Sequence, residues 1–204
     1  MLEIQLVVLT IAEGKLRLLA SPSGLPARTL SHAEPLDRAA QRLLRQEVSA
    51  DHLYLEQLYT FALRGGRVVV GYLALVRNAR LQRAGHSWHE PLPNLRNGQR
   101  TVAEYGLTRL RNKITYTNLA FAFLPDRFTL SELQNTYEVV LERSLDKRNF
   151  RKRILTMGIL TADGVARRGG RPACLYRFTG PREVAFWPSF APNGKQKATA
   201  DKRR

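Results

Sequence analysis

Cysteine, acidic residues and long apolar runs are all scarce in this 204-residue chain. The single cysteine, Cys174, excludes an internal disulfide and leaves no set of thiolates for a structural zinc site, which suits a reducing compartment. No run reaches the roughly 18 apolar residues of a membrane-spanning helix, and the first residues lack the basic-then-apolar pattern of a signal peptide. We therefore expect a cytoplasmic protein with no membrane partner.

The shortage of acids gives the chain a strong positive charge. It has 33 Lys and Arg against 17 Asp and Glu, a formal net charge of +16. From residue 126 onward there are 17 basic and 8 acidic residues, so more than half of the excess lies in the last two-fifths of the chain. This asymmetry indicates a surface for a polyanion such as nucleic acid. Residues 191–204 are polar and basic, and they predict a disordered tail with non-specific phosphate affinity.

The first 83 residues mix strand and helix patterns. Alternating apolar residues predict a β-hairpin over residues 1–20, and apolar residues at helical spacing predict a helix over 34–48. Two further strand-like runs, 54–61 and 68–76, are separated by a glycine turn. The order hairpin, helix, hairpin is typical of an α+β domain.

Residues 84–114 are predicted to form a polar loop and a connecting helix. The loop holds His86, His89 and Glu90, which we interpret as surface residues because neither a fourth ligand nor helical i, i+4 spacing supports a metal site. The second half of the segment has apolar residues at helical spacing. The apolar run at 116–124 that follows fits a helix and a strand equally well.

Clear helix boundaries follow residue 126. Thr129 and Glu132 have the spacing of a capping box, and apolar residues at helical spacing come after them. Asp146 is the expected N-cap of a second helix and Gly158 its expected end, with an apolar stripe between them that can dock on the first helix. The rest of that second helix is basic. Like charges at helical spacing repel each other unless something negative lies against them.

A basic hairpin is expected next, because β-like runs at 159–161 and 174–178 enclose a Gly- and Arg-rich tip. Helix, turn, basic helix and hairpin together indicate a winged helix-turn-helix, whose basic helix enters the DNA major groove and whose tip contacts the backbone or minor groove. The alternative is a basic helical hairpin that binds RNA or an acidic partner. The predicted DNA-binding residues are Arg148, Asn149, Arg151 and Lys152 for bases or backbone, Lys147 and Arg153 closer to phosphates, and Arg167, Arg168 and Arg171 at the tip.

Several segments together resemble one family. FTLSELQ, LDKRNFRKRIL and RPACLYRF look like the winged-helix domain of the Nudix-related transcriptional regulators, which are bacterial repressors of NAD-metabolism genes. YLEQLYTF resembles a strand of their Nudix-like effector domain, and LTRLRNKITY resembles their linker helix. The resemblance implies a degenerate Nudix-like domain at 1–83, a loop and linker helix at 84–114, and a winged helix at 115–190. It also implies a homodimer on a palindromic double-stranded DNA operator, with ADP-ribose or a related molecule as effector.

The Nudix signature itself is degraded in this chain. G-x5-E-x7-R-E-U-x-E-E-x-G-U, where U is a bulky aliphatic residue, presents several glutamates to metals that bridge a pyrophosphate. Its glutamate and arginine correspond to Glu34 and Arg42, but its three metal-binding acids correspond to Leu43, Gln46 and Glu47. One carboxylate cannot hold such a metal tightly. We therefore expect no catalysis, no metal and no cofactor, with Glu47 as an ordinary surface acid at a helix end.

Other interpretations of the sequence stay open. The connection at 20–25 is shorter than in the family, so the effector pocket is either reshaped for another ligand or lost, leaving a dimerisation platform. A Nudix-type hydrolase of nucleoside diphosphate-linked substrates is one rival function. A non-specific nucleic-acid-binding protein that uses the basic tail is another.

Overall fold

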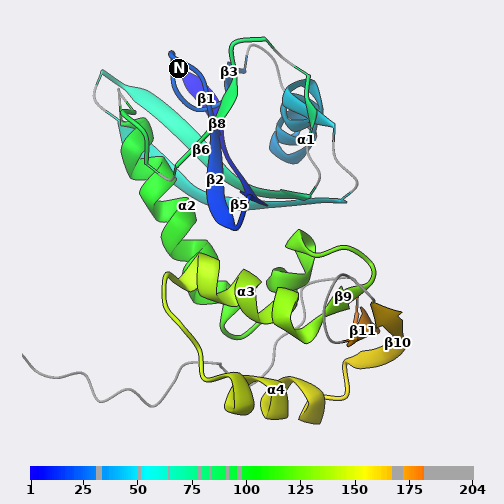
Figure 1. Cartoon of the computed structure of the whole chain (residues 1–204). Helices are drawn as coiled ribbons and strands as arrows, with labels where there is room; N and C mark the ends of the chain where they lie inside the picture. Colours follow the sequence, from blue (N-terminus) through cyan, green and yellow to red (C-terminus); the bar gives the residue numbers. More distant parts are fainter. Residues whose placement is uncertain are drawn as a thin grey trace, which may run out of the picture.

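The chain forms a mixed β-sheet with one helix on each face and a smaller, largely helical domain at one end (Figure 1). This computed structural model describes residues 1–30, 34–49, 52–63, 65–77, 80–82, 84–90, 92–95, 98–166 and 172–181. Within those ranges, no helix is both long enough and apolar enough to cross a bilayer.

Six strands form the main sheet and two more form a short ladder. The main sheet contains β1 (Leu2–Ala12), β2 (Lys15–Ala20), β3 (Ala27–Thr29), β5 (His52–Leu63), β6 (Arg67–Arg77) and β8 (Ser87–His89), and the ladder contains β4 (Val48–Ser49) and β7 (Arg80–Leu81). The main order is β5-β6-β1-β2-β8, with β3 also paired to β1. β1 runs parallel to β6, and every other pair is antiparallel.

The central strand β1 is buried on both faces because its apolar residues supply both cores. Ile4, Leu6 and Val8 lie in the cluster on one face, whereas Val7 and Leu9 lie in the cluster on the other, as the two-residue period of a strand requires. The helices that cover these faces are α1 (Leu36–Glu47) and α2 (Gln99–Ile114). The sheet thus forms the middle layer of a three-layer domain.

The α+β prediction for the first 83 residues is confirmed. The predicted hairpin, helix and second pair of strands coincide with β1–β2, α1 and β5–β6. The predicted polar loop after residue 84 is wrong in part, because Ser87–His89 forms β8 against β2 and Trp88 packs on the α1 side of the sheet. A three-residue strand is too short to show a period in the sequence, so only its partner strand determines it.

The second domain contains the predicted helices and hairpin. Its elements are a 3-10 helix η1 (Asn118–Phe123), β9 (Phe128–Thr129), α3 (Leu130–Leu141), α4 (Lys147–Thr156), β10 (Leu160–Ala166) and β11 (Ala173–Phe178). The strands form a three-stranded sheet in the order β10-β11-β9. The run at 116–124, which the sequence left undecided between helix and strand, is largely η1.

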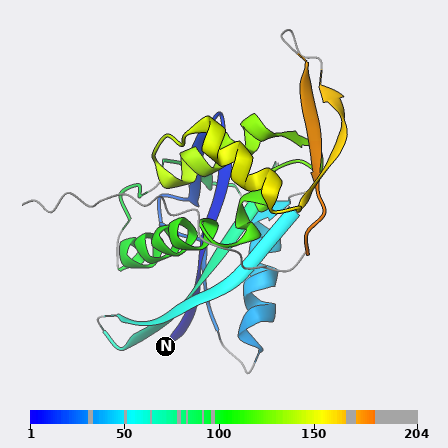
Figure 2. The same ribbon diagram turned by 90° about the horizontal axis from the view of Figure 1, so that it is seen from below.

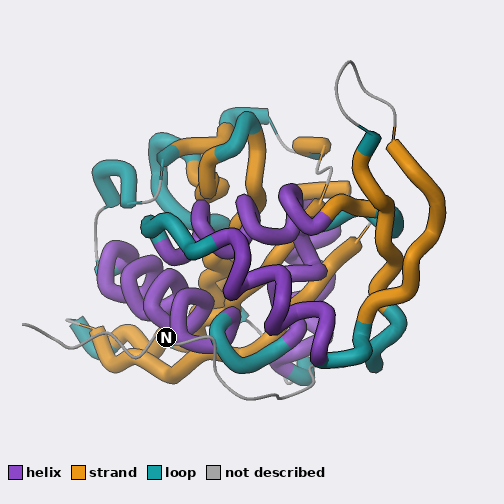
Figure 3. The backbone as a smooth tube through the Cα atoms, turned by 60° about the horizontal axis from the view of Figure 1, so that its bottom comes forward, coloured by secondary structure: helices purple, strands orange, loops and turns teal. Residues whose placement is uncertain are grey.

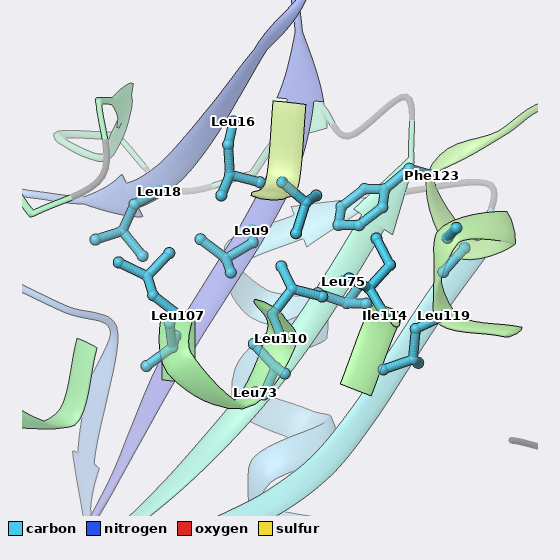
Figure 4. Close-up of a cluster of buried hydrophobic side chains, with 14 of the residues drawn as sticks. Leu9, Leu16, Leu18, Leu73, Leu75, Leu107, Leu110, Ile114, Leu119 and Phe123 are labelled. Atoms are coloured by element: carbon cyan, nitrogen blue, oxygen red, sulfur yellow. The ribbon is translucent and has the colours of Figure 1, made fainter. Parts of the chain in front are cut away.

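One hydrophobic core extends across both domains. It begins on the α2 face of the sheet with residues such as Leu9 and Leu75, continues through Leu110 of α2 and Phe123 of η1, and reaches Ile154 of α4. Figure 4 shows the part of this cluster where side chains of β1, β2, β6, α2 and η1 meet. Because α2 contacts both the sheet and α3, the two domains are packed against each other through α2.

Candidate nucleic-acid interface

The α-helices α3 and α4 of the second domain each begin at a local hydrogen-bond motif. At α3, Thr129 Oγ1 accepts from the amide of Glu132 at 3.1 Å, and a Glu132 carboxylate oxygen accepts from the amide of Thr129 at 2.7 Å. This is the expected capping box. At α4, Asp146 Oδ1 accepts from the amide of Asn149 at 2.8 Å, so the expected N-cap is also present.

The turn between α3 and α4 is held from the α3 side. Gln134 Nε2 donates to the carbonyl of Leu145 at 3.0 Å, and Glu138 Oε1 accepts from the Leu145 amide at 2.8 Å. Gln134 also donates to Glu138 at 2.9 Å. Both backbone polar groups of Leu145 are therefore satisfied, which restricts the direction in which α4 leaves the turn.

α4 docks on α3 through a narrow apolar stripe. Phe150 is 4% exposed and Ile154 is fully buried. The ring of Phe150 meets that of Tyr137 on α3 edge-to-face, with centroids 5.4 Å apart. Burial also raises the pKa of Tyr137 above its usual range. This stripe holds one side of α4 against the domain and leaves the opposite side facing outward.

The basic residues of α4 fall into an outer group and a flanking group. With about 100° of rotation per residue, Arg148 and Lys152 lie nearly opposite Phe150, and both are exposed together with Asn149. Arg151 is half-buried and donates to Ser131 Oγ on α3 at 3.1 Å. Lys147 is exposed and Arg153 half-buried, and both lie on the flanks of the docking stripe. Their expected place nearer phosphates stays a prediction.

One outward-facing residue was not predicted from the sequence: Leu155 is 48% exposed although it is apolar. Helical position alone could have identified it, because it falls about 20° from Arg148 around the axis. The outer surface of α4, formed by Arg148, Asn149, Lys152 and Leu155, is called the α4 outer face below.

The hairpin projects beside α4 as a two-stranded arm (Figure 2). Its base is fixed by Asp163 of β10, which accepts from Arg177 of β11 at 2.9 Å and from Arg127 before β9 at 2.9 Å. The hydrogen bonds from Arg177 hold the pKa of Asp163 below its usual range, and the charge of Arg127 acts in the same direction. Phe178 stacks on Phe121 of η1 with centroids 4.1 Å apart. The hairpin is thus anchored at its base by charge and by stacking.

The predicted tip residues fall outside the described part of the chain. Arg167, Arg168 and Arg171 belong to the stretch 167–171 between β10 and β11, so their role stays a prediction. Figure 3 shows the two strands that lead toward this tip and their position next to the helices of the domain. Cys174, at the start of β11, is exposed.

The face of α1 that corresponds to the Nudix signature is also on the described part of the chain. Arg42 and Glu34 form an ion pair at 2.5 Å. Leu43 belongs to the buried core and Gln46 is exposed. Among the described residues, no group of three or more His, Cys, Asp or Glu side chains is placed to hold a metal ion.

Two expectations about residues at the end of α1 and beside it are wrong. Glu47 is fully buried rather than a surface acid, and the side chain of His86 is only 8% exposed rather than on a surface loop. Glu47 Oε2 and His86 Nδ1 lie 3.2 Å apart. The physical reason is the β4–β7 ladder together with a bond from the amide of Gln82 to the carbonyl of Glu47 at 2.8 Å, which fold the segment before β8 over the end of α1.

Comparison with known proteins gives matches to both domains. Residues 120–178 match the family model described as the NrtR DNA-binding winged helix domain. The chain is 30% identical to the ADPR responsive transcriptional repressor NtrR of Acinetobacter baylyi over 87% of this chain and 82% of that protein. Its fold is similar to the crystal structure of Shewanella oneidensis NrtR complexed with a 27mer DNA, with a TM-score of 0.75 and 26% identity over 87% of this chain and 93% of that one.

A further similarity concerns the fold alone. The MutT/nudix family protein of Enterococcus faecalis has a TM-score of 0.67 at 18% identity, over 87% of this chain and 85% of that one. The predicted combination of a Nudix-like domain and a winged helix is therefore confirmed. From its winged helix, its two-domain fold and its similarity to the repressor along most of both sequences, we conclude that this chain belongs to the NrtR family of transcriptional regulators.

Proposed function

We propose that this protein is a transcriptional repressor that binds a palindromic double-stranded DNA operator as a homodimer. In this proposal the two copies of α4 enter successive major grooves about one helical turn apart. The regulated genes belong to NAD metabolism, as for the family named above, and the protein acts in the cytoplasm. We propose a Nudix-like domain built on residues 1–83, a winged helix at 115–190 and a basic tail at 191–204. The intervening residues 84–114, the loop and linker helix, add β8 to the sheet and cover one of its faces with α2.

The observation that carries the proposal is the α4 outer face. Arg148, Asn149 and Lys152 are exposed on the side of α4 opposite Phe150 and Ile154, which are fixed in the core. The residue types suit the task, because guanidinium and ammonium groups bind phosphates and guanine while an asparagine amide can pair with adenine. The solved NrtR complex with DNA has the same overall fold, which supports DNA as the polyanion rather than RNA or an acidic protein.

The proposed effector is ADP-ribose or a similar molecule, bound by the Nudix-like domain. The Acinetobacter relative is ADPR responsive by name, and its similarity to this chain covers both domains. The shared core through α2 offers a route by which a ligand on the first domain could change the position of α4. An effector would then shift the population between an arrangement that fits both half-sites and one that does not.

We further propose that the Nudix-like domain does not hydrolyse its ligand. Of the three positions that correspond to metal-binding acids, Leu43 is in the core and Gln46 is neutral. The remaining Glu47 is buried and lies against His86, so its carboxylate already has a partner. A bridging divalent metal needs several oxygen ligands, which this arrangement does not supply.

The main test is selection of genomic fragments with purified protein at moderate salt, followed by gel shifts of the enriched sequence with and without ADP-ribose. An enriched palindrome upstream of NAD-metabolism genes that ADP-ribose releases is the expected result. A palindrome that is indifferent to ADP-ribose would retain the operator and refute the effector. If the protein binds all DNA sequences with equal affinity and loses this affinity when residues 192–204 are removed, the result would favour a non-specific nucleic-acid-binding protein instead.

The second test replaces one residue of the α4 outer face. Arg148→Ala should weaken binding by about 1–3 kcal/mol and relax specificity at one base pair if Arg148 reads a base, or weaken all sequences equally and reduce the salt slope by about 1 if it binds phosphate. The matched control is Arg100→Ala on α2, an exposed arginine paired with Glu104. If both variants bind like the original protein, Arg148 does not belong to the interface.

The hydrolase alternative has a direct test. Purified protein is incubated with ADP-ribose and Mg²⁺ or Mn²⁺, and AMP release is measured. We expect no release above that of the Glu47→Gln variant. Turnover that Glu47→Gln abolishes would show that the buried carboxylate still serves a metal and would refute the proposed loss of catalysis.

A further inference from the structure

The α4 outer face contains one large apolar side chain among its polar ones. Leu155 is 48% exposed, whereas Phe150 and Ile154 on the docking side are almost or fully buried. At about 100° per residue, Leu155 lies about 20° from Arg148 and about 60° from Lys152 around the helix axis. An apolar group in the last turn of this basic helix therefore points in nearly the same direction as the expected DNA contacts.

The neighbours of Leu155 on this face do not explain it as part of the core. Lys152 is exposed, and Thr156 is exposed with its hydroxyl donating to the carbonyl of Lys152 at 2.8 Å. Arg148, about two turns earlier on the same side, is also exposed. In the major groove, the 5-methyl group of thymine is the one apolar feature that base edges present, and aliphatic side chains contact it.

We propose that Leu155 is a specificity-determining residue that recognises the methyl group of one thymine in each operator half-site. The inference rests on the proposed binding of DNA by α4. The helix rise of about 1.5 Å per residue places Leu155 about 10 Å beyond Arg148 along the axis. Base pairs are about 3.4 Å apart and a recognition helix lies at an angle to the duplex axis, so the thymine lies within about three base pairs of the position that Arg148 contacts.

The experiment uses the full chain and the operator recovered by selection. Each thymidine is replaced in turn by deoxyuridine, which removes the methyl group and leaves every hydrogen-bonding group of the base unchanged, and the dissociation constant is measured by fluorescence anisotropy. We expect one position per half-site at which binding weakens about fourfold, the effect of withholding one buried methyl group. Replacement in both half-sites should weaken binding about sixteenfold.

The protein variant that tests the residue is Leu155→Ala. It should bind the unmodified operator more weakly and no longer distinguish thymidine from deoxyuridine at the sensitive position. Lys152→Ala is the matched control from the same face, and it should lose affinity while keeping the deoxyuridine effect. Alanine has a higher helix propensity than leucine, so α4 is kept, and an unchanged melting temperature checks this.

The outcomes separate the inference from the function on which it rests. If no enriched operator is found, the proposed function fails and the inference fails with it. If an operator is bound but no thymidine is sensitive, or if Leu155→Ala keeps the sensitivity, the inference is overturned while DNA binding by α4 stands. A large fall in melting temperature for Leu155→Ala would also overturn it, because Leu155 would then be a packing residue.

Discussion

Replacement of Phe150 by alanine tests whether the two domains share one core. Phe150 is 4% exposed, and its ring meets Tyr137 at a centroid distance of 5.4 Å. It belongs to the same cluster as Leu9 and Leu75 of the main sheet, with α2 between them. The substitution removes a ring from the far end of this cluster and changes no charge. Any effect on the sheet domain must therefore travel through packing.

The expected size follows from burial. A buried phenylalanine truncated to alanine costs about 3–5 kcal/mol, because apolar surface is lost and a cavity remains. For a chain of this length, each kcal/mol lowers the melting temperature by about 2–4 °C, so a fall of about 6–20 °C is expected. Since the core is continuous, we expect the whole chain to melt in one transition at the lower temperature.

Differential scanning calorimetry of the full chain is the assay, with circular dichroism as a second probe. The matched control is Lys152→Ala, an exposed residue two positions further along α4, which should change stability by no more than about 0.5 kcal/mol. Two separate transitions, of which only the smaller moves in Phe150→Ala, would refute the shared core. Such a result would also weaken the proposed route from effector to α4.

Three further predictions concern single hydrogen-bonded groups. Asp146→Ala removes the α4 N-cap that accepts from the Asn149 amide and should cost about 1 kcal/mol in urea unfolding, whereas Asp146→Ser should cost much less. Tyr72→Phe deletes the 2.7 Å hydrogen bond to Asp37 and should cost about 1 kcal/mol of stability. Burial raises the pKa of Tyr72, so the stability of the unmutated protein should fall as the pH rises above about 10. Alkaline melting curves should show a smaller fall for the variant. Two arginines hold the pKa of Asp163 low, so its contribution should be present above a pH of about 4 and lost as the pH falls further, and Asp163→Asn should flatten that acid limb of the melting curve.

The elements with local signals were predicted well from the sequence. Thr129 with Glu132 and Asp146 with Gly158 mark helix boundaries through contacts between residues a few positions apart, and the structure has those contacts. Apolar periodicity likewise placed the docking stripe on α4, including Phe150. Such signals depend on the chain only over a turn or two, so they can be recognised without knowledge of the fold.

Features that depend on distant partners were missed or misread. Glu47 and His86 are 39 positions apart, and no local sequence pattern predicts that either is buried. They come together only because the β4–β7 ladder folds one segment over the other. Strand β8 exists because β2 offers it an edge. Leu155 was overlooked for another reason: a leucine in a helix is expected to face the core, although its helical position, about 20° from Arg148, places it on the exposed side.

The parallel pairing of β1 with β6 sets an order for folding. Along one edge, β1 can pair with β2 across the two residues that separate them and with β3 soon after, but the strand on its other edge, β6, begins only at Arg67, after α1 and β5. During synthesis, the edge of β1 that pairs with β6 therefore stays unpaired after the β1–β2 hairpin has emerged from the ribosome, until more than fifty further residues have been added. Exposed edges of this kind recruit other strands. We therefore expect the nascent chain to be most prone to misassociation before β6 arrives, and docking of β6 beside β1, a contact between distant residues, to limit the folding rate.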